Sequence, residues 1–334
     1  MNRKPRSLGR TSLLLLLAAF VSLQPGLAPA PAQPAAQDEK PTFVLTDIAP
    51  GADLKIVAYG DMRFTATSNT IDTNPRVRKW LAEKVGAEKP DLLFLSGDMP
   101  HRGAYPEDWA IYRSETASWT QNHLRVYPTL GNHEGIGGMA AGLKNYFGVY
   151  PQIEQHRYYS MVAGSVELIT LDTTQKVEKG SPQFAWLDAQ LASIPPQVNF
   201  VFFLLHMPLM ADVQSQVIVN LPAPEMWELR RYLEEKASHS RARYIAVSGH
   251  IHNYERFQHG GITYLISGGG GAIPYPVLVR SPEDLYQEAG FPNYHYIVLN
   301  LHGKRIDATM YRVADPKAET LSVEVKDKFA LVAP

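Results

Sequence analysis

LKIVAYGD, at residues 54–61, is an apolar run that ends abruptly in a glycine and an aspartate. The same arrangement recurs along the chain, because four later apolar runs also end in Gly, Asp, Asn or His. They are DLLFLSGD at 91–98, LRVYPTLGN at 124–132, FVFFLLH at 200–206 and RYIAVSGH at 243–250. Continuous apolar runs of this length predict central strands that are covered on both faces.

Helical patterns lie between these runs. Residues 76–85 place Trp80, Leu81 and Val85 on one face, and residues 184–194 and 225–236 repeat that spacing. Strands that alternate with helices predict a layered α/β domain. The last third is strand-like, with GITYLISGGGG, YHYIVLNL, RIDATMYRV and LSVEVKD, so we expect a second sheet that packs on the first.

Composition is that of a globular protein, with 334 residues of which 45% are hydrophobic and 19% charged. This is enough apolar material for one large core or two modest ones. The chain has no cysteine, which excludes a disulfide framework and a thiolate metal site. Any bound metal must therefore be held by His, Asp, Asn or similar ligands.

The N-terminus has the layout of a secretory signal peptide. Four basic residues precede an apolar run at 13–21, and the small-residue and proline tract GLAPAPAQPAAQ follows at 26–37. A membrane anchor is the alternative, but a spanning helix needs about 20 apolar residues. We expect a signal peptide at 1–32, a linker at 33–42 and a single domain at 43–334, and hence an exported protein, periplasmic or extracellular.

Removal of the signal peptide would change the formal net charge from −1 to −5, because residues 1–32 carry four positive charges and no negative one. A mildly acidic chain is not built for general attraction to nucleic acid or to anionic membranes. We therefore expect no nucleic-acid partner and no stable membrane span after processing, and a monomer that acts alone.

Polar side chains stand at the ends of the predicted strands, where loops of an α/β sheet collect ligands. They are Asp61, Asp98, Asn132, His206, His250 and His252. Taken singly, a strand-end Asp is usually a turn former, and a lone His is usually a hydrogen-bonded core residue. Together they form a set of oxygen and nitrogen donors that suits Zn, Mn or Fe.

These residues and their neighbours resemble the motifs of a known family. The series Gly60-Asp61, Gly97-Asp98, Gly131-Asn132-His133-Glu134, His206 and Gly249-His250-Ile251-His252 is similar to the calcineurin-like metallophosphoesterase superfamily, in its purple-acid-phosphatase-like bacterial branch. The glycine run 268–271 resembles one that follows the last motif in that branch, and we expect it to let the backbone approach the site closely. The resemblance implies an α/β fold, a four-layer αββα sandwich of two mixed β-sheets flanked by helices.

The resemblance also implies a centre of two divalent or trivalent metal ions, Fe, Mn or Zn, bridged by Asp98. One ion would take Asp61, Asp98 and His252, and the other Asp98, Asn132, His206 and His250. A hydroxide held between two such ions would attack phosphorus in line. His133 would act as a general acid or donor near the leaving oxygen, oriented by a carboxylate such as Asp98.

The first motif departs from the family pattern. Many members have Asp-x-His, whereas this chain has Asp61-Met62-Arg63, and a guanidinium does not coordinate a metal. Purple acid phosphatases recover a ligand from a Tyr three residues after the second-motif Asp, and His101 stands at that position here. We expect His101 to complete the first metal site; a loop His that only forms hydrogen bonds is the alternative.

Arg102-Gly103 matches a form of the second motif found in the protein-phosphatase branch, where the Arg contacts phosphate. A guanidinium fork suits phosphate oxygens, so Arg102 or Arg63 is expected to clamp substrate. For either residue, a surface salt bridge is the alternative. The candidate catalytic residues are thus His133, Asp98 and Arg102, and the segments 103–122, 135–155 and 175–181 are expected to be loops that shape the cleft.

The sequence therefore predicts an exported, metal-dependent hydrolase of a small phosphorylated substrate, with a phosphomonoesterase favoured. A phosphodiesterase with the same site is one alternative. A binding protein that has lost catalysis through its altered first site is another. A zinc metalloprotease is excluded, because His133-Glu134 lacks the second His of the HExxH spacing.

Overall fold

The computed structural model describes residues 42–215, 224–277, 280–288 and 290–334. The predicted signal peptide, and the predicted linker apart from Thr42, lie outside the described residues. Residues Asp38–Pro334 form one compact unit. Within the described part of this unit, no helix combines the length and apolar character needed to cross a membrane.

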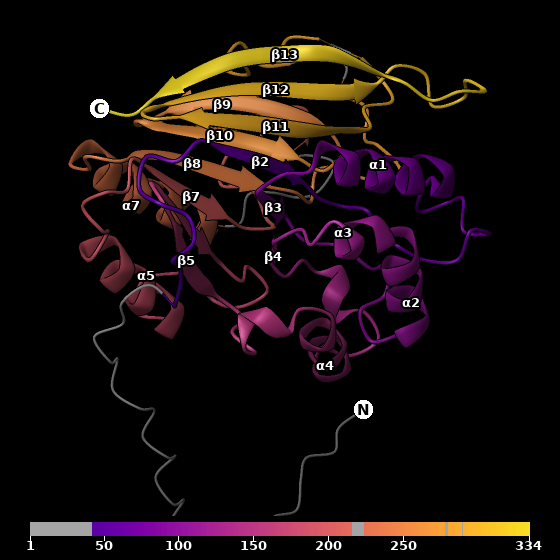
Figure 1. Cartoon of the computed structure of the whole chain (residues 1–334), viewed down its shortest axis with the longest axis horizontal. Helices are drawn as coiled ribbons and strands as arrows, with labels where there is room; N and C mark the ends of the chain where they lie inside the picture. Colours follow the sequence, from indigo (N-terminus) through magenta and orange to yellow (C-terminus); the bar gives the residue numbers. More distant parts are fainter. Residues whose placement is uncertain (1–41, 216–223, 278–279, 289) are drawn as a thin grey trace, which may run out of the picture. The chain divides into compact units, whose positions relative to one another are not determined.

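One mixed sheet, here called the β2 sheet, combines strands from the first half of the sequence with the last strands (Figure 1). Its described strands, in spatial order, are β13 (Val323–Val332), β12 (Arg305–Val313), β11 (His295–His302), β2 (Leu54–Tyr59), β3 (Leu92–Leu95) and β4 (Val126–Pro128). β2, β3 and β4 run parallel, and β2 pairs antiparallel with β11 on its other side. The carboxyl ends of β2, β3 and β4 therefore meet at one edge.

The second mixed sheet, the β7 sheet, contains the first strand of the described residues and the strands from the middle of the sequence. Its described strands, in spatial order, are β1 (Phe43–Leu45), β5 (Tyr159–Ala163), β6 (Val166–Thr170), β7 (Phe200–Leu204), β8 (Arg243–Ser248), β10 (Ile262–Ser267) and β9 (Tyr254–His259). β6, β7, β8 and β10 run parallel to one another. The expected second sheet is present. The last third of the chain does not form it alone but is divided between the sheets, since β9 and β10 join β8 while β11, β12 and β13 join β2.

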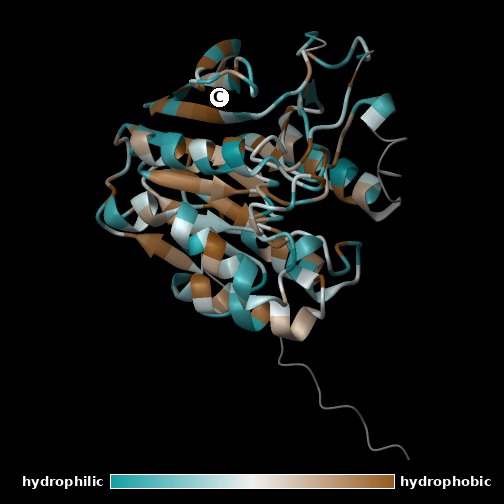
Figure 2. Cartoon of the chain, turned by 90° about the vertical axis from the view of Figure 1, so that its right-hand side faces the viewer, coloured by the Kyte–Doolittle hydropathy of each residue, from teal (hydrophilic) through white to brown (hydrophobic). Residues whose placement is uncertain are grey.

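The two sheets face each other across the core. Phe94 of β3 meets Phe202 of β7 with ring centroids 5.5 Å apart. The outer face of the β7 sheet is covered by α5 (Pro182–Ala192) and α7 (Pro224–Ser238), whose buried leucines pack with Val201 and Phe203. α1 (Pro75–Glu88) packs against β11 of the other sheet. Figure 2 shows the hydrophobic colour concentrated on the strands between these helices. The predicted sandwich of two mixed sheets flanked by helices is confirmed.

Local sequence signals explain where the helices begin. Asn74 caps α1 by accepting a hydrogen bond from the Val77 amide at 3.2 Å, and Ser181 caps α5 in the same way. Each cap is followed by a proline, which lacks an amide hydrogen and is preorganised for the first helical position. α1 ends at Lys89, which adopts a left-handed conformation with φ 48°.

Two segments that were expected to be loops contain helices. Segment 103–122 forms α2 (Pro106–Glu115) and α3 (Ala117–Gln121), and segment 135–155 forms α4 (Met139–Val149) and the short η2 (Pro151–Ile153). The loop prediction is wrong because aromatic burial stabilises these segments: Trp109 packs edge-on against Tyr112, Tyr146 and Tyr150. Pro106 followed by Glu107 and Asp108 was a helix-start signal of the usual kind.

Glu167 on β6 is a carboxylic acid that is buried in the middle of the β7 sheet. Its side chain is 1% exposed, its Oε2 has no hydrogen-bond partner among the described residues, and burial raises its pKa to about 7. The folded chain therefore keeps a proton up to about pH 7 that an unfolded glutamate releases near pH 4.5. Stability is lost as the pH rises through this interval.

Glu167→Gln should remove this loss. The gain in unfolding free energy over the natural chain should be greater at pH 8 than at pH 4.5, by up to about 3 kcal/mol. Urea denaturation at the two pH values measures it, with the exposed Glu83→Gln as the control. A gain that is independent of pH would contradict the buried-acid interpretation.

Candidate metal centre

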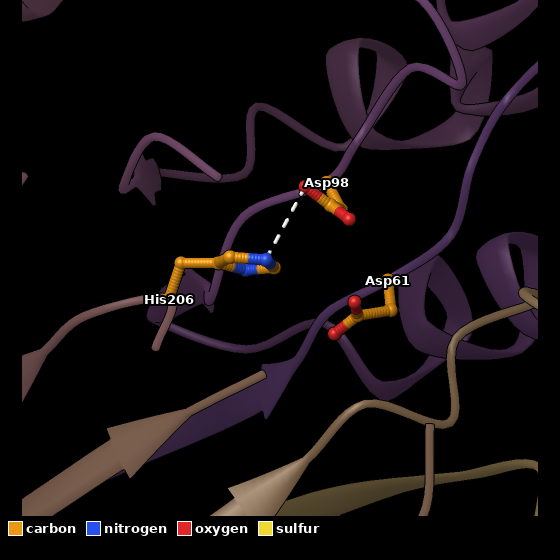
Figure 3. Close-up of side chains that lie close together, drawn as sticks. All are labelled: Asp61, Asp98 and His206. Atoms are coloured by element: carbon orange, nitrogen blue, oxygen red, sulfur yellow. Dashed lines mark ion pairs between the residues drawn. The ribbon is translucent and has the colours of Figure 1, made fainter. Parts of the chain in front are cut away.

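Loops that follow strands of both sheets bring three side chains together (Figure 3). Asp61 follows β2, Asp98 follows β3 and His206 follows β7. One ligand atom from each lies within 4.8 Å of the others, and all three side chains are buried. His206 Nε2 is 3.3 Å from Asp98 Oδ1. Three potential ligands at this separation fit a metal ion.

The backbone around these side chains is held in an unfavourable conformation. Asp61, Arg63, Asp98 and His250 have φ values of 58°, 52°, 55° and 68°, the left-handed region that costs a residue with a Cβ about 1 kcal/mol or more. Hydrogen bonds between the first two loops hold it there, because the Asp61 amide donates to Gly97 and the Arg63 amide to Asp98, both at 3.0 Å. Such strain is typical of functional sites.

A second group of donors lies beside Asp98. His206 Nε2 and His250 Nδ1 each lie 3.0 Å from Asn132 Oδ1 and 3.1 Å from each other. His206 Nδ1 donates to the Ser96 carbonyl at 2.9 Å, so its Nε2 carries a lone pair when the ring is neutral. Burial lowers the pKa of His250 to about 3, so the His250 ring is neutral at neutral pH. The Asn132 amide oxygen and an imidazole nitrogen thus direct lone pairs toward the same place, where a cation would fit.

Asp61 and His252 form another pair of potential metal ligands, and both have an atom that a cation could satisfy. Asp61 Oδ1 and His252 Nε2 lie 3.5 Å apart, and both are buried without a hydrogen-bond partner among the described residues. His252 Nδ1 donates to the Ile273 carbonyl at 2.8 Å, which leaves the Nε2 lone pair facing Asp61. Burial raises the pKa of Asp61 to about 7 and lowers that of His252 to about 3. A cation would satisfy both atoms, because it replaces the hydration that burial removes.

His133 lies against the same carboxylate. Its backbone amide donates to Asp98 Oδ1 at 2.9 Å, and its Nε2 is 3.8 Å from Asp98 Oδ2. Its Nδ1 donates to the His101 carbonyl at 2.6 Å, which fixes the ring and leaves Nε2 as the atom that faces the site. Burial lowers the pKa of His133 to about 4.

Glu134 clamps two loops together, a role that the sequence motif did not reveal. Its carboxylate accepts three backbone hydrogen bonds, from Gly131 at 2.7 Å, Met99 at 2.9 Å and Asp98 at 3.1 Å. The side chain is fully buried. The loops after β3 and β4 are thereby fixed to each other, and with them the positions of Asp98 and Asn132.

His101 lies beside His133, with ring centroids 5.3 Å apart. Its Nε2 is 3.6 Å from Asp72 Oδ2, and its Nδ1 is buried without a hydrogen-bond partner among the described residues. The group formed by Asp61, Asp98 and His206 does not include it. A role for His101 as a metal ligand stays a prediction.

The two candidate arginines differ in their surroundings. Arg102 donates from Nε and Nη2 to the buried carboxylate of Asp108, both at 3.0 Å, and its guanidinium lies over the Tyr105 ring. Arg63 instead enters the centre, with Nη2 3.4 Å from Asp98 Oδ2. The fork of Arg102 is therefore already bound, whereas that of Arg63 faces the candidate ligands.

The glycine run 268–271 packs directly against the first loop and the last. The Gly270 amide donates to Gly60 O at 2.9 Å, and a Cβ at Gly270 would lie 2.4 Å from that oxygen. A Cβ at Gly268 would lie 2.1 Å from Ile251 O, between the two proposed histidine ligands in sequence. The expectation that this run permits a close backbone approach is confirmed. Tyr275, which the sequence did not single out, stacks on His252 with centroids 4.3 Å apart.

Comparison with known proteins agrees with this geometry. Residues 54–254 match the model of the calcineurin-like phosphoesterase family. The chain is 25% identical over 256 residues to an Arabidopsis thaliana protein named probable inactive purple acid phosphatase 1, covering 65% of this chain and 41% of that protein. It is 24% identical over 271 residues to probable purple acid phosphatase 20 of the same plant, covering 74% and 59%. The chain thus spans about half the length of the curated relatives it matches.

A solved structure shows the same fold. The purple acid phosphatase PPD1 from yellow lupin (Lupinus luteus) seeds superposes with a TM-score of 0.66 and 18% identity, covering 85% of this chain and 55% of that one. The family match extends over more than half of the chain and includes every motif residue from Asp61 to His252. The chain therefore belongs to the calcineurin-like phosphoesterase family.

Proposed function

We propose that this chain is an exported, metal-dependent hydrolase that cleaves small phosphomonoesters at a dinuclear centre and acts as a monomer. The observation that carries the proposal is the presence of two groups of potential metal ligands near Asp98. In the first group, Asp61 Oδ1 and His252 Nε2 are buried and have no hydrogen-bond partner in the part of the chain that the structure describes. In the second group, His206 and His250 converge on Asn132 Oδ1.

The ligands divide between two sites in this proposal. The first ion would be held by Asp61, Asp98 and His252, with His101 as a further ligand, and the second by Asp98, Asn132, His206 and His250. Fe, Mn or Zn ions bound there would neutralise charge on the phosphate and lower the pKa of water to near neutrality. The remaining work falls to the side chains of the chain itself.

His133 is the proposed donor to the leaving oxygen. The hydrogen bond from Nδ1 to the His101 carbonyl fixes the ring, so a proton held at Nε2 would face the substrate. The second contact, from the His133 amide to Asp98 Oδ1, ties this ring to the proposed bridging carboxylate. Burial disfavours the doubly protonated ring, and the anionic phosphate of a bound substrate would counteract that effect.

Turnover of matched chromogenic esters tests the proposal. We expect 4-nitrophenyl phosphate to be hydrolysed faster than bis(4-nitrophenyl) phosphate when the protein is loaded with Mn, Zn or Fe, and Ca to support little activity because it prefers more oxygen ligands. Faster hydrolysis of the diester would favour a phosphodiesterase. If no metal in the panel supports turnover of either ester, the chain is a binding protein of the same fold.

A further inference from the structure

Arg63 is the charged side chain at the point where this chain departs from many members of its family. The side chain is 13% exposed, and its Nη2 lies 3.4 Å from Asp98 Oδ2. Asp98 is fully buried and also contacts His206 and His133. The guanidinium therefore lies within the candidate centre, next to the proposed bridging carboxylate, rather than on the outer surface.

The Arg63 guanidinium forms few hydrogen bonds with the described residues. Nε is buried and has no acceptor among the described residues. The contact with Asp98, at 3.4 Å, is longer than the 2.7–2.9 Å typical of a charge-assisted hydrogen bond. A buried donor without an acceptor costs about 1–3 kcal/mol, and more when it is charged. An anionic acceptor that enters the site would satisfy these donors.

The main chain on both sides of the Arg63 side chain is fixed by other residues. Its amide donates to the Asp98 carbonyl at 3.0 Å, and its carbonyl accepts from Arg78 Nη1 at 3.1 Å. Arg78 is fully buried and is itself held by two hydrogen bonds to Glu115, at 2.9 and 2.6 Å. The backbone that carries the guanidinium is thus fixed, which lowers the ordering cost when an anion binds.

Arg102 is less suited to the same task. Both of its donors on one edge of the fork are bound to Asp108, and Asp108 is buried and also accepts from Thr65. Releasing the fork would leave a buried carboxylate with a single hydroxyl partner. One edge of the Arg102 fork is therefore occupied, whereas Nε of Arg63 has no acceptor among the described residues.

We infer that Arg63, and not Arg102, binds the phosphate group, through Nε and a terminal nitrogen that donate to its non-bridging oxygens. This inference rests on the proposed function and names the residue that recognises the substrate. A planar fork binds two oxygens of a phosphate at once, which a metal-ligating histidine at position 63 could not do. No bond is made or broken in this step.

Binding of inorganic phosphate to the metal-loaded protein tests the inference, and it needs no turnover. Arg63→Met keeps the length of the side chain and removes its charge and donors; Arg305→Met, in an exposed ion pair with Asp307, is the matched control. We expect Arg63→Met to weaken phosphate binding by about 10- to 100-fold in calorimetry, as for hydrogen bonds to a charged group. Metal content by elemental analysis should be unchanged in both variants.

Arg63→Lys provides a second variant that retains the charge without the fork, and it should bind phosphate more tightly than Arg63→Met and less tightly than the natural chain. Unchanged phosphate affinity in Arg63→Met overturns the inference, and so does a loss of metal that accounts for the weaker binding. A natural chain that binds phosphate but hydrolyses neither ester contradicts the proposed function alone. Failure of the metal-loaded natural chain to bind phosphate overturns both.

Discussion

Asp98→Asn should reduce phosphomonoester turnover by more than about 100-fold and should lower the metal content of the purified protein. Loss of a group that only orients a ligand typically costs 10- to 100-fold in metal affinity or activity, and Asp98 is proposed as a shared ligand itself. The carboxylate is fully buried and lies 3.3 Å from His206 Nε2 and 3.4 Å from Arg63 Nη2. Asparagine keeps the shape and removes the anion that both ions would share.

Three measurements separate this effect from misfolding. Turnover of 4-nitrophenyl phosphate and elemental analysis report on the centre, while the thermal midpoint reports on the fold. The matched control is Asp307→Asn, which removes an exposed carboxylate on β12 and should leave both turnover and metal content unchanged. An Asp98→Asn protein with full metal content and near-natural turnover would eliminate Asp98 as the shared ligand.

Glu115→Ala should lower the free energy of unfolding by about 3–5 kcal/mol, because it leaves the Arg78 charge buried without its partner. Arg78 is fully buried and donates to both carboxylate oxygens of Glu115, at 2.9 and 2.6 Å. It also donates to the carbonyls of Arg63 and Thr65, at 3.1 and 3.0 Å. The pair therefore supports the loop that carries the first motif.

Urea denaturation measures the loss, with the exposed Glu83→Ala on α1 as the control. The double variant Arg78→Met with Glu115→Leu should recover most of the stability, because apolar residues of similar volume often replace a buried ion pair without cost. It should not recover phosphate affinity, since the Arg63 carbonyl would still lack its donor. A loss below about 1 kcal/mol in Glu115→Ala would show that water or another group reaches Arg78.

Much of the fold could be predicted because the apolar patterns that specify its strands are short, continuous stretches of the sequence. Each of the five apolar runs contains a strand, and each ends within a few residues of a candidate ligand. Parallel pairing then brings the ends of β2, β3 and β4 to one edge of the β2 sheet and the ends of β7 and β8 to one edge of the β7 sheet. The helices of segments 103–122 and 135–155 were missed because their burial depends on aromatic contacts between segments, such as Trp109 with Tyr146, which no local period reveals.

The candidate site also has features that the sequence predicts and others that it does not. The residue types and their order along the chain predicted that Asp61, Asp98 and His206 would converge, and they do. The part played by Glu134 could not be predicted, because its acceptors bind amides of Asp98 and Met99 from another loop. The difference between Arg102 and Arg63 depends on where Asp108 lies after α2 has formed, which the motif alone does not specify.

The anchoring of residue 63 through its main chain has a consequence for how such a site can diverge. Its amide and carbonyl are bound by Asp98 and Arg78, and neither contact involves the side chain of residue 63. Exchange of that side chain therefore need not move the loop. A single substitution at this position could therefore replace a metal-coordinating imidazole with a guanidinium. The net charge of the centre would change while the backbone that supports it stays the same.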